Sequence, residues 1–231
     1  MIESLQDPKD FVIIITGDLL DNAFNVFSYF RMKSFIRALE RSGYIVLIAP
    51  GNHDYGTGGW GFSFFIRIFK KVYYNNPSVT FPKLNIIDHN AFIALDSMEG
   101  VLKGHVTFFA QGKLGKPQLD AVSKLMYSPA VIACDYIILY LHHHPFDYRP
   151  FMQLLDSEKL GEIIEKKVDI LLFGHFHERE EEEEGKNFHG IWSIHPCYNA
   201  GSSTGKDNKQ GRIRLIAPEE ERMYDEVIMI D

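Results

Sequence analysis

The sequence predicts one domain of the α/β class, with α+β character toward the C-terminus. Helix-like and strand-like segments alternate through most of the chain, and two short alternating runs, 212–217 and 223–230, predict a pair of antiparallel strands near its end. With 231 residues and 45% apolar content, the chain can bury one sizeable core and is short for two. We therefore expect a single domain over residues 1–231.

Four apolar runs predict strands, and polar residues follow each of them. The runs are Val12 to Ile15, Tyr44 to Ile48, Tyr136 to Leu141 and Asp169 to Phe173. The strings that follow are Gly17-Asp18-Leu19-Leu20-Asp21, Gly51-Asn52-His53-Asp54, His142-His143-His144-Pro145 and Gly174-His175-Phe176-His177. Ligands in α/β sheets gather outside the carboxyl ends of the strands, so we expect these side chains to lie close together. Carboxylate, amide and imidazole groups in one place predict a metal site.

Three segments have apolar residues at helical spacing and predict helices on the faces of the sheet. The first, 24–41, has Phe24, Phe27, Phe35 and Leu39 at that spacing and ends before Gly43. The others are 115–126 and 151–167. A short strand is expected between Ala91 and Ser97.

Residues 56–74 allow two interpretations. A glycine-rich start leads into a run of large apolar residues that includes Trp60, Phe64 and Phe65 and ends at Lys70-Lys71. One interpretation is a helix that faces the core. The other is an apolar lid beside the site, in contact with a hydrophobic part of the substrate or with a membrane surface. The sequence does not decide between them.

Composition excludes several classes of protein. Two scattered cysteines, Cys134 and Cys197, cannot form a disulfide framework, so we expect a reducing, cytoplasmic location. The sequence has no apolar stretch long enough for a transmembrane segment. The net charge of −7 predicts no clear nucleic-acid binding, and much of it comes from six Glu and one Arg in residues 178–184. We expect that run to be solvated. Oligomeric state is not predicted.

The order of the four polar strings resembles that of the calcineurin-like metallophosphoesterases. This resemblance implies two packed, mixed β-sheets flanked by helices, a four-layer sandwich with the metals at one rim. It also implies a metal-dependent hydrolase that acts on a small phosphoester substrate. We expect a phosphodiesterase in which a metal-bound hydroxide attacks the phosphorus.

By resemblance, two metals have five protein ligands: Asp18, Asn52, His143, His175 and His177. Asp18 bridges both ions and His177 reaches the first. His143 is chosen from its trio because family members place the ligand two residues before proline. Residues alternate sides along a strand, so His142 and His144 should point away from His143 and play supporting roles. Mixed nitrogen and oxygen ligands favour Mn, Fe, Zn or Ni.

His53 stands at the family position of the general acid, which protonates the leaving oxygen. Asp21 is expected to hold the other ring nitrogen of His53 with its carboxylate. Both assignments come from the resemblance.

The family also has an opening element that these residues lack. Its members usually begin with a strand that ends in Asp-x-His, and residues 1–9 contain no such string. We expect an upstream segment to supply that first strand, and we expect one firmly held metal rather than two in its absence. Two functions stay open: a metal-dependent phosphodiesterase, and a catalytically weak or inactive binding scaffold with the same fold.

Overall fold

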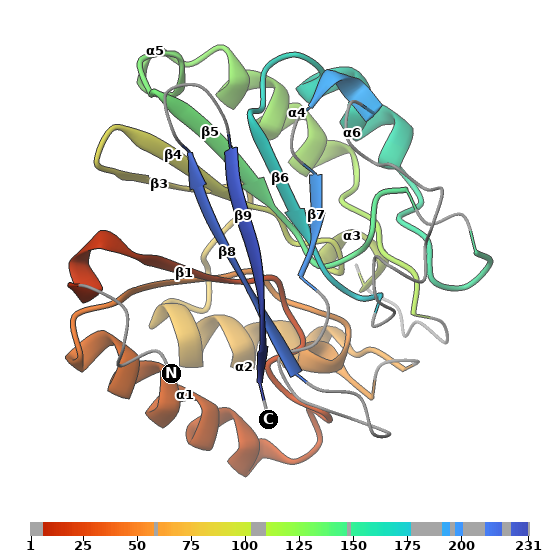
Figure 1. Ribbon diagram of the computed structural model, residues 1–231. Helices are drawn as coiled ribbons and strands as arrows, with labels where there is room; N and C mark the ends of the chain where they lie inside the picture. The colour runs from red at the N-terminus through yellow and green to blue at the C-terminus, as the bar shows by residue number, and fades with distance from the viewer. Residues whose placement is uncertain are drawn as a thin grey trace.

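Figure 1 shows the computed structural model, which describes residues 7–57, 60–102, 110–146, 149–176, 191–194, 197–200, 211–218 and 223–230. The strands are β1 (Val12–Ile15), β2 (Ile45–Ile48), β3 (Lys83–Ile87), β4 (Asn90–Ala94), β5 (Tyr136–Tyr140), β6 (Ile170–Phe173), β7 (Cys197–Asn199), β8 (Gly211–Pro218) and β9 (Met223–Ile230). The helices are α1 (Val26–Arg41), α2 (Ser63–Tyr74), α3 (Glu99–Leu102), α4 (Lys116–Met126), α5 (Pro129–Ile132) and α6 (Ser157–Ile164).

The strands form one five-stranded sheet and two pairs. The large sheet has the order β3-β4-β5-β6-β7, in which only the β3–β4 pairing is antiparallel. β1 and β2 pair in parallel, with Val12 opposite Ile45 and Ile15 opposite Ile48. β8 and β9 form the expected antiparallel pair. The five-stranded sheet is therefore mixed, as the family resemblance implies, whereas the β1–β2 pair is only parallel and the β8–β9 pair is only antiparallel.

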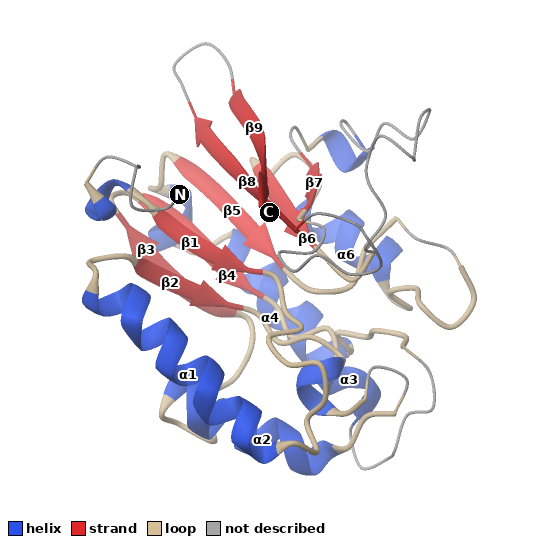
Figure 2. Cartoon of the chain, turned by 60° about the horizontal axis from the view of Figure 1, so that its bottom comes forward, coloured by secondary structure: helices blue, strands red, loops and turns tan. Residues whose placement is uncertain are grey.

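Three apolar clusters define the layers. One lies between the large sheet and helices α4 and α6, and it contains Leu139, Leu119 and Leu160. A second lies between the large sheet and β1–β2, where Ile216 of β8 also packs. The third joins β1–β2 to α1 and α2. Figure 2 shows α1 and α2 on the outer side of β1 and β2. The protein is thus two sheet layers flanked by helices, and the predicted fold class is confirmed.

The apolar segments gave accurate strands, whereas one helix is shorter than predicted. β1 has the predicted bounds, but α6 covers only Ser157–Ile164 of the predicted 151–167. Phe151 has a φ of 75°, which ends any helical path there. The Asp156 carboxylate accepts hydrogen bonds from Leu114 N (3.0 Å) and Gly115 N (2.8 Å) before α4, so residues 151–156 form a loop tied to that helix.

α2 has an inner face in the core. Phe65, Phe69 and Val72 are buried, which agrees with the core-facing interpretation of residues 56–74. Trp60 and Phe64 are exposed instead. Within the described residues, no helix has the length and apolar character needed to cross a membrane.

Candidate metal centre

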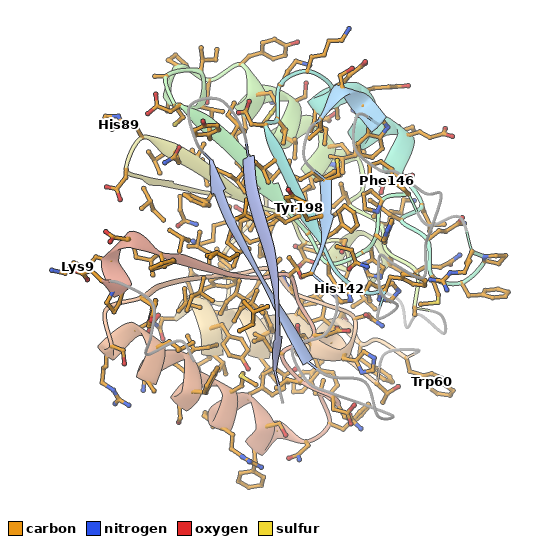
Figure 3. The ribbon with its side chains drawn as sticks, in the orientation of Figure 1. Lys9, Trp60, His89, His142, Phe146 and Tyr198 are labelled. Atoms are coloured by element: carbon orange, nitrogen blue, oxygen red, sulfur yellow. The ribbon has the colours of Figure 1, made fainter. Side chains whose placement is uncertain are left out.

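The carboxyl ends of four strands from both sheet layers meet at one rim. Asp18 follows β1, Asn52 follows β2, His142 follows β5 and His175 follows β6. Backbone hydrogen bonds hold the β5 and β6 ends together, from Leu141 N to Leu172 O (3.1 Å) and from Gly174 N to His142 O (2.9 Å). Figure 3 shows His142 between the two layers. The expectation that these strand ends converge is met.

His142 Nε2 is the centre of this cluster. It lies 2.8 Å from Asn52 Oδ1, 3.0 Å from His175 Nδ1 and 3.3 Å from Asp18 Oδ2. The other ring nitrogen, Nδ1, lies 2.8 Å from the Thr16 carbonyl oxygen. A carbonyl oxygen can only accept, so Nδ1 carries a proton and Nε2 of the neutral ring turns a lone pair toward the cluster.

The arrangement fits a cation. Potential ligand atoms of Asp18, His142 and His175 lie within 4.8 Å of one another. A carboxylate, an amide oxygen and an imidazole lone pair repel one another unless positive charge lies among them. A divalent ion would supply that charge, and a carbonyl on the far nitrogen is the usual support for a metal-binding histidine. The residues present therefore fit a metal ion.

Without an ion, the electrostatics favour a proton on His142 Nε2 as the positive charge of the cluster, and a bound metal ion would replace that proton. Burial raises the pKa of Asp18, but the neighbouring His142 and His53 outweigh it and bring that pKa down to about 2. Burial lowers the pKa of His142, yet the Asp18 carboxylate outweighs it and the net shift is upward. The cluster thus favours a carboxylate beside a positive charge.

Backbone geometry makes this close approach possible. A Cβ on Gly17, which has a φ of 101°, would lie 2.7 Å from His142 Nδ1, and one on Gly51 would lie 2.2 Å from Asp18 Oδ1. Asp18 and His175 themselves have φ values of 54° and 70°. Such left-handed backbone in non-glycine residues is strained and clusters at functional sites.

The histidine trio differs from the expectation. The structure brings His142, rather than His143, into contact with Asp18 and Asn52. His143 Nδ1 lies 2.7 Å from Ser97 Oγ, and Nε2 lies 3.1 Å from the Ala110 carbonyl oxygen. Burial, followed by the nearby His175 and His142, lowers the pKa of His143 well below its usual value. His143 is thus a neutral, hydrogen-bonded side chain next to the cluster.

His144 points into the apolar interior. Its ring centroid lies 4.4 Å from that of Phe173. The predicted alternation of the three histidines does not hold. The His142 and His143 rings lie 5.1 Å apart and both lie within 5 Å of the His175 ring, measured between centroids, because β5 ends at Tyr140 and the three histidines follow it.

His53 lies at the edge of the cluster and is half-buried. Its Nδ1 lies 2.7 Å from the Asp21 backbone carbonyl oxygen, and its backbone N–H donates to Asp18 Oδ1 at 3.0 Å. Asp21 does hold His53, but through its carbonyl group rather than the carboxylate that we expected, and its side chain is exposed. His177, the predicted ligand of the first metal, lies outside the described residues.

Asp54 is a supporting residue to which sequence reasoning assigned no role. It is fully buried, and its two oxygens accept from Leu20 N (3.1 Å) and Gly51 N (2.8 Å). It thereby ties the loop after β1 to the loop after β2. Burial, and then Asp18, raise the pKa of Asp54 to about 8. The sequence signal that could have indicated a role for Asp54 is its position directly after Asn52 and His53.

This fold and this cluster define a protein with an α/β sandwich and a metal-ligand set at its strand ends. A family model described as calcineurin-like phosphoesterase matches residues 1–179. The chain belongs to that family, and the resemblance found in its motifs is confirmed. Membership supports metal-dependent hydrolysis of small phosphoesters. A comparison with curated proteins found no match.

Proposed function

We propose that this protein is a phosphodiesterase whose cation is held by Asp18, Asn52, His142 and His175. The observation that carries the proposal is the position of His142 Nε2, which lies within 3.3 Å of a possible metal-ligand atom from each of the other three residues. The imidazole and oxygen donors favour Mn, Fe, Zn or Ni over Mg or Ca. When bound, such an ion lowers the pKa of water and neutralises charge on the phosphoryl oxygens.

The residues of the chain divide the remaining work. The Thr16 carbonyl fixes the tautomer of His142, and Asp54 fixes the loops that carry Asp18 and Asn52. His53 serves as general acid: the Asp21 carbonyl orients its ring, so Nε2 faces away and can deliver a proton to the leaving oxygen. The Asp18 carboxylate accepts from the His53 backbone N–H and fixes the position of that residue beside the cluster.

Charge supports a diester over a monoester as the substrate. The Asp18 carboxylate cancels one charge of a divalent ion and leaves +1, which matches the single negative charge of a phosphodiester, whereas a monoester carries close to two. Three statements stay predictions: that His177 binds another ion, that residues 1–231 form a single domain, and that the protein is cytoplasmic.

The test is hydrolysis of bis-p-nitrophenyl phosphate and p-nitrophenyl phosphate by protein stripped with a chelator and then given Mn, Fe, Zn or Ni. We expect activity to disappear with the metal, to return with one of these ions and to be higher on the diester. Asp18→Asn should abolish the returned activity, and His89→Ala, at an exposed position remote from the rim, is the control. Metal uptake without hydrolysis of either ester would favour the binding scaffold, and a preference for the monoester would contradict the diester assignment.

A further inference from the structure

The outer side of α1 and α2 exposes large aromatic side chains. We call this surface the aromatic face. Phe27, Phe30 and Phe35 lie on α1, Phe64 lies on α2, and Phe24 and Trp60 lie in the loops that precede these helices. Phe27 is 81% exposed and Phe64 is 66% exposed. Single exposed apolar residues are ordinary, but six large aromatic residues on two adjacent helices and the loops before them are typical of an interaction surface.

Helical spacing places these aromatic residues away from the core. On α1, Tyr29 and Ile36 are buried, and Phe27 and Phe30 are exposed on other sides of the helix. Phe64 of α2 is likewise exposed next to the buried Phe65. Phe27 and Phe30 therefore contribute little to the packing of α1, whereas the Phe64 ring also lies 5.5 Å from that of Phe65, measured between centroids.

The two helices that carry the aromatic face are basic. α1 and α2 together contain seven Lys and Arg and one Glu, a net charge of +6, so the rest of the chain carries −13. Five of the basic residues are exposed: Arg31, Arg37, Arg41, Arg67 and Lys71. Within the described part of the chain, none of these five forms an ion pair. The charge is therefore available to an anionic partner.

The aromatic face adjoins the candidate metal centre. Asp21, whose carbonyl group holds His53, precedes Phe24 by three residues. The Phe24 ring lies 5.3 Å from that of Phe62 and 5.0 Å from that of Phe65, measured between centroids. Figure 3 shows Trp60 projecting outward on the same side of the molecule as His142.

We propose that the aromatic face docks the protein peripherally on an anionic phospholipid surface. Exposed phenylalanines would enter the interface between headgroups and acyl chains, and the arginines and lysines would meet lipid phosphates. The acidic remainder of the chain would be repelled by the same surface. Attraction on one face and repulsion elsewhere would fix one orientation.

Other occupants fit less well. A second copy of this chain would place the five exposed basic residues opposite their own counterparts across a symmetric contact. Nucleic acid needs a groove or platform on which bases stack, and this face is the outside of two helices (Figure 2). A lipid surface needs neither symmetry nor a groove.

The experiment is flotation of the full chain with vesicles of phosphatidylcholine alone or mixed with phosphatidylglycerol. We expect binding to the mixed vesicles, weaker binding in high salt, and little binding to phosphatidylcholine alone. The double variants Phe27→Ser with Phe30→Ser, and Arg31→Glu with Arg37→Glu, should each weaken binding by about tenfold or more. Tyr127→Ser and Lys124→Glu change exposed residues of matched type at α4, in the opposite helical layer, and should leave binding unchanged.

Four results would overturn the proposal. The first two are absence of binding to mixed vesicles and an equal loss of vesicle binding in the α4 controls. The third is binding of single-stranded RNA that depends on the arginines and not on the phenylalanines. The fourth is a concentration-dependent dimer that Phe27→Ser disrupts. Hydrolysis is not measured, so failure here leaves the proposed function standing, and an inactive enzyme leaves the docking intact.

Discussion

The rim of the molecule and its aromatic face hold charge in opposite ways. At the rim, Asp54 and His142 are buried, and short hydrogen bonds hold them in place. On the aromatic face, Arg31 and Arg37 are exposed among exposed phenylalanines. Buried, fixed polar groups suit a small ion that is held by few atoms, whereas exposed charge with apolar side chains suits a broad surface. The difference indicates two separate recognition tasks on one domain.

The largest effect should come from His53 at the rim. His53→Ala removes the proposed proton donor, so hydrolysis of esters with poor leaving groups should fall by about 10² to 10⁴-fold. p-Nitrophenolate leaves without a proton, and its esters should lose much less. Steady-state rates on methyl p-nitrophenyl and dialkyl phosphodiesters measure the difference, with metal content as the control. Equal losses on both kinds of ester would remove the acid role.

Stability should separate the two faces of the α1–α2 layer. Phe69 is fully buried in the cluster that joins these helices to β1–β2, so Phe69→Ala should cost about 3 to 5 kcal/mol of unfolding free energy. Phe27→Ala, on the aromatic face, should stay within about 0.5 kcal/mol of the wild type. Urea denaturation measures both. A large loss in Phe27→Ala would show that the aromatic face serves the fold.

A smaller effect, dependent on pH, is expected at Asp96, where the Tyr55 hydroxyl donates to Oδ2 at 2.8 Å. Burial, and then Glu99, raise the pKa of Asp96 from its usual 3.8 to about 6. The folded protein therefore keeps this proton between those values while the unfolded chain releases it, so this group lowers stability as pH rises from about 4 to 6, by roughly 2 to 3 kcal/mol.

Asp96→Asn keeps the shape and removes the titration. The difference in unfolding free energy between variant and wild type should therefore shift in favour of the variant as pH rises from about 4 to 7. Urea denaturation at several pH values tests this. A difference that does not change with pH would mean that Asp96 is not held protonated.

Much of the fold could be predicted because its signals are local. The β-branched run Val12–Ile15 forms β1 with the predicted bounds, and the polar strings lie at strand ends as expected. β3 and β7 were not predicted as strands, since both lie at the edges of the large sheet and depend on a neighbour for pairing. α6 was predicted too long because Asp156 bonds to a segment some 40 residues away.

The site was predicted less completely for a tertiary reason. Alternation along a strand predicted that His142 and His143 face opposite sides, but β5 ends at Tyr140 and both rings lie next to His175. Which of the two rings contacts Asp18 and Asn52 depends on how the end of β5 meets Thr16 after β1, a contact between residues 126 positions apart. The group that holds His53 was also predicted wrongly. Every residue has a backbone carbonyl group, so the sequence does not show which carbonyl accepts a hydrogen bond.

The most direct test of the central claim compares the same substitution at two adjacent positions. His142→Gln and His143→Gln are purified without chelators, checked by circular dichroism and analysed for bound metal. If His142 Nε2 is a ligand, His142→Gln should lower metal affinity by about tenfold or more, because a strong imidazole ligand is replaced by an amide. His143→Gln, whose amide can still bond to Ser97 and Ala110, should keep the metal. Loss of metal in His143→Gln with retention in His142→Gln would contradict the account and restore the ligand that the sequence alone suggested.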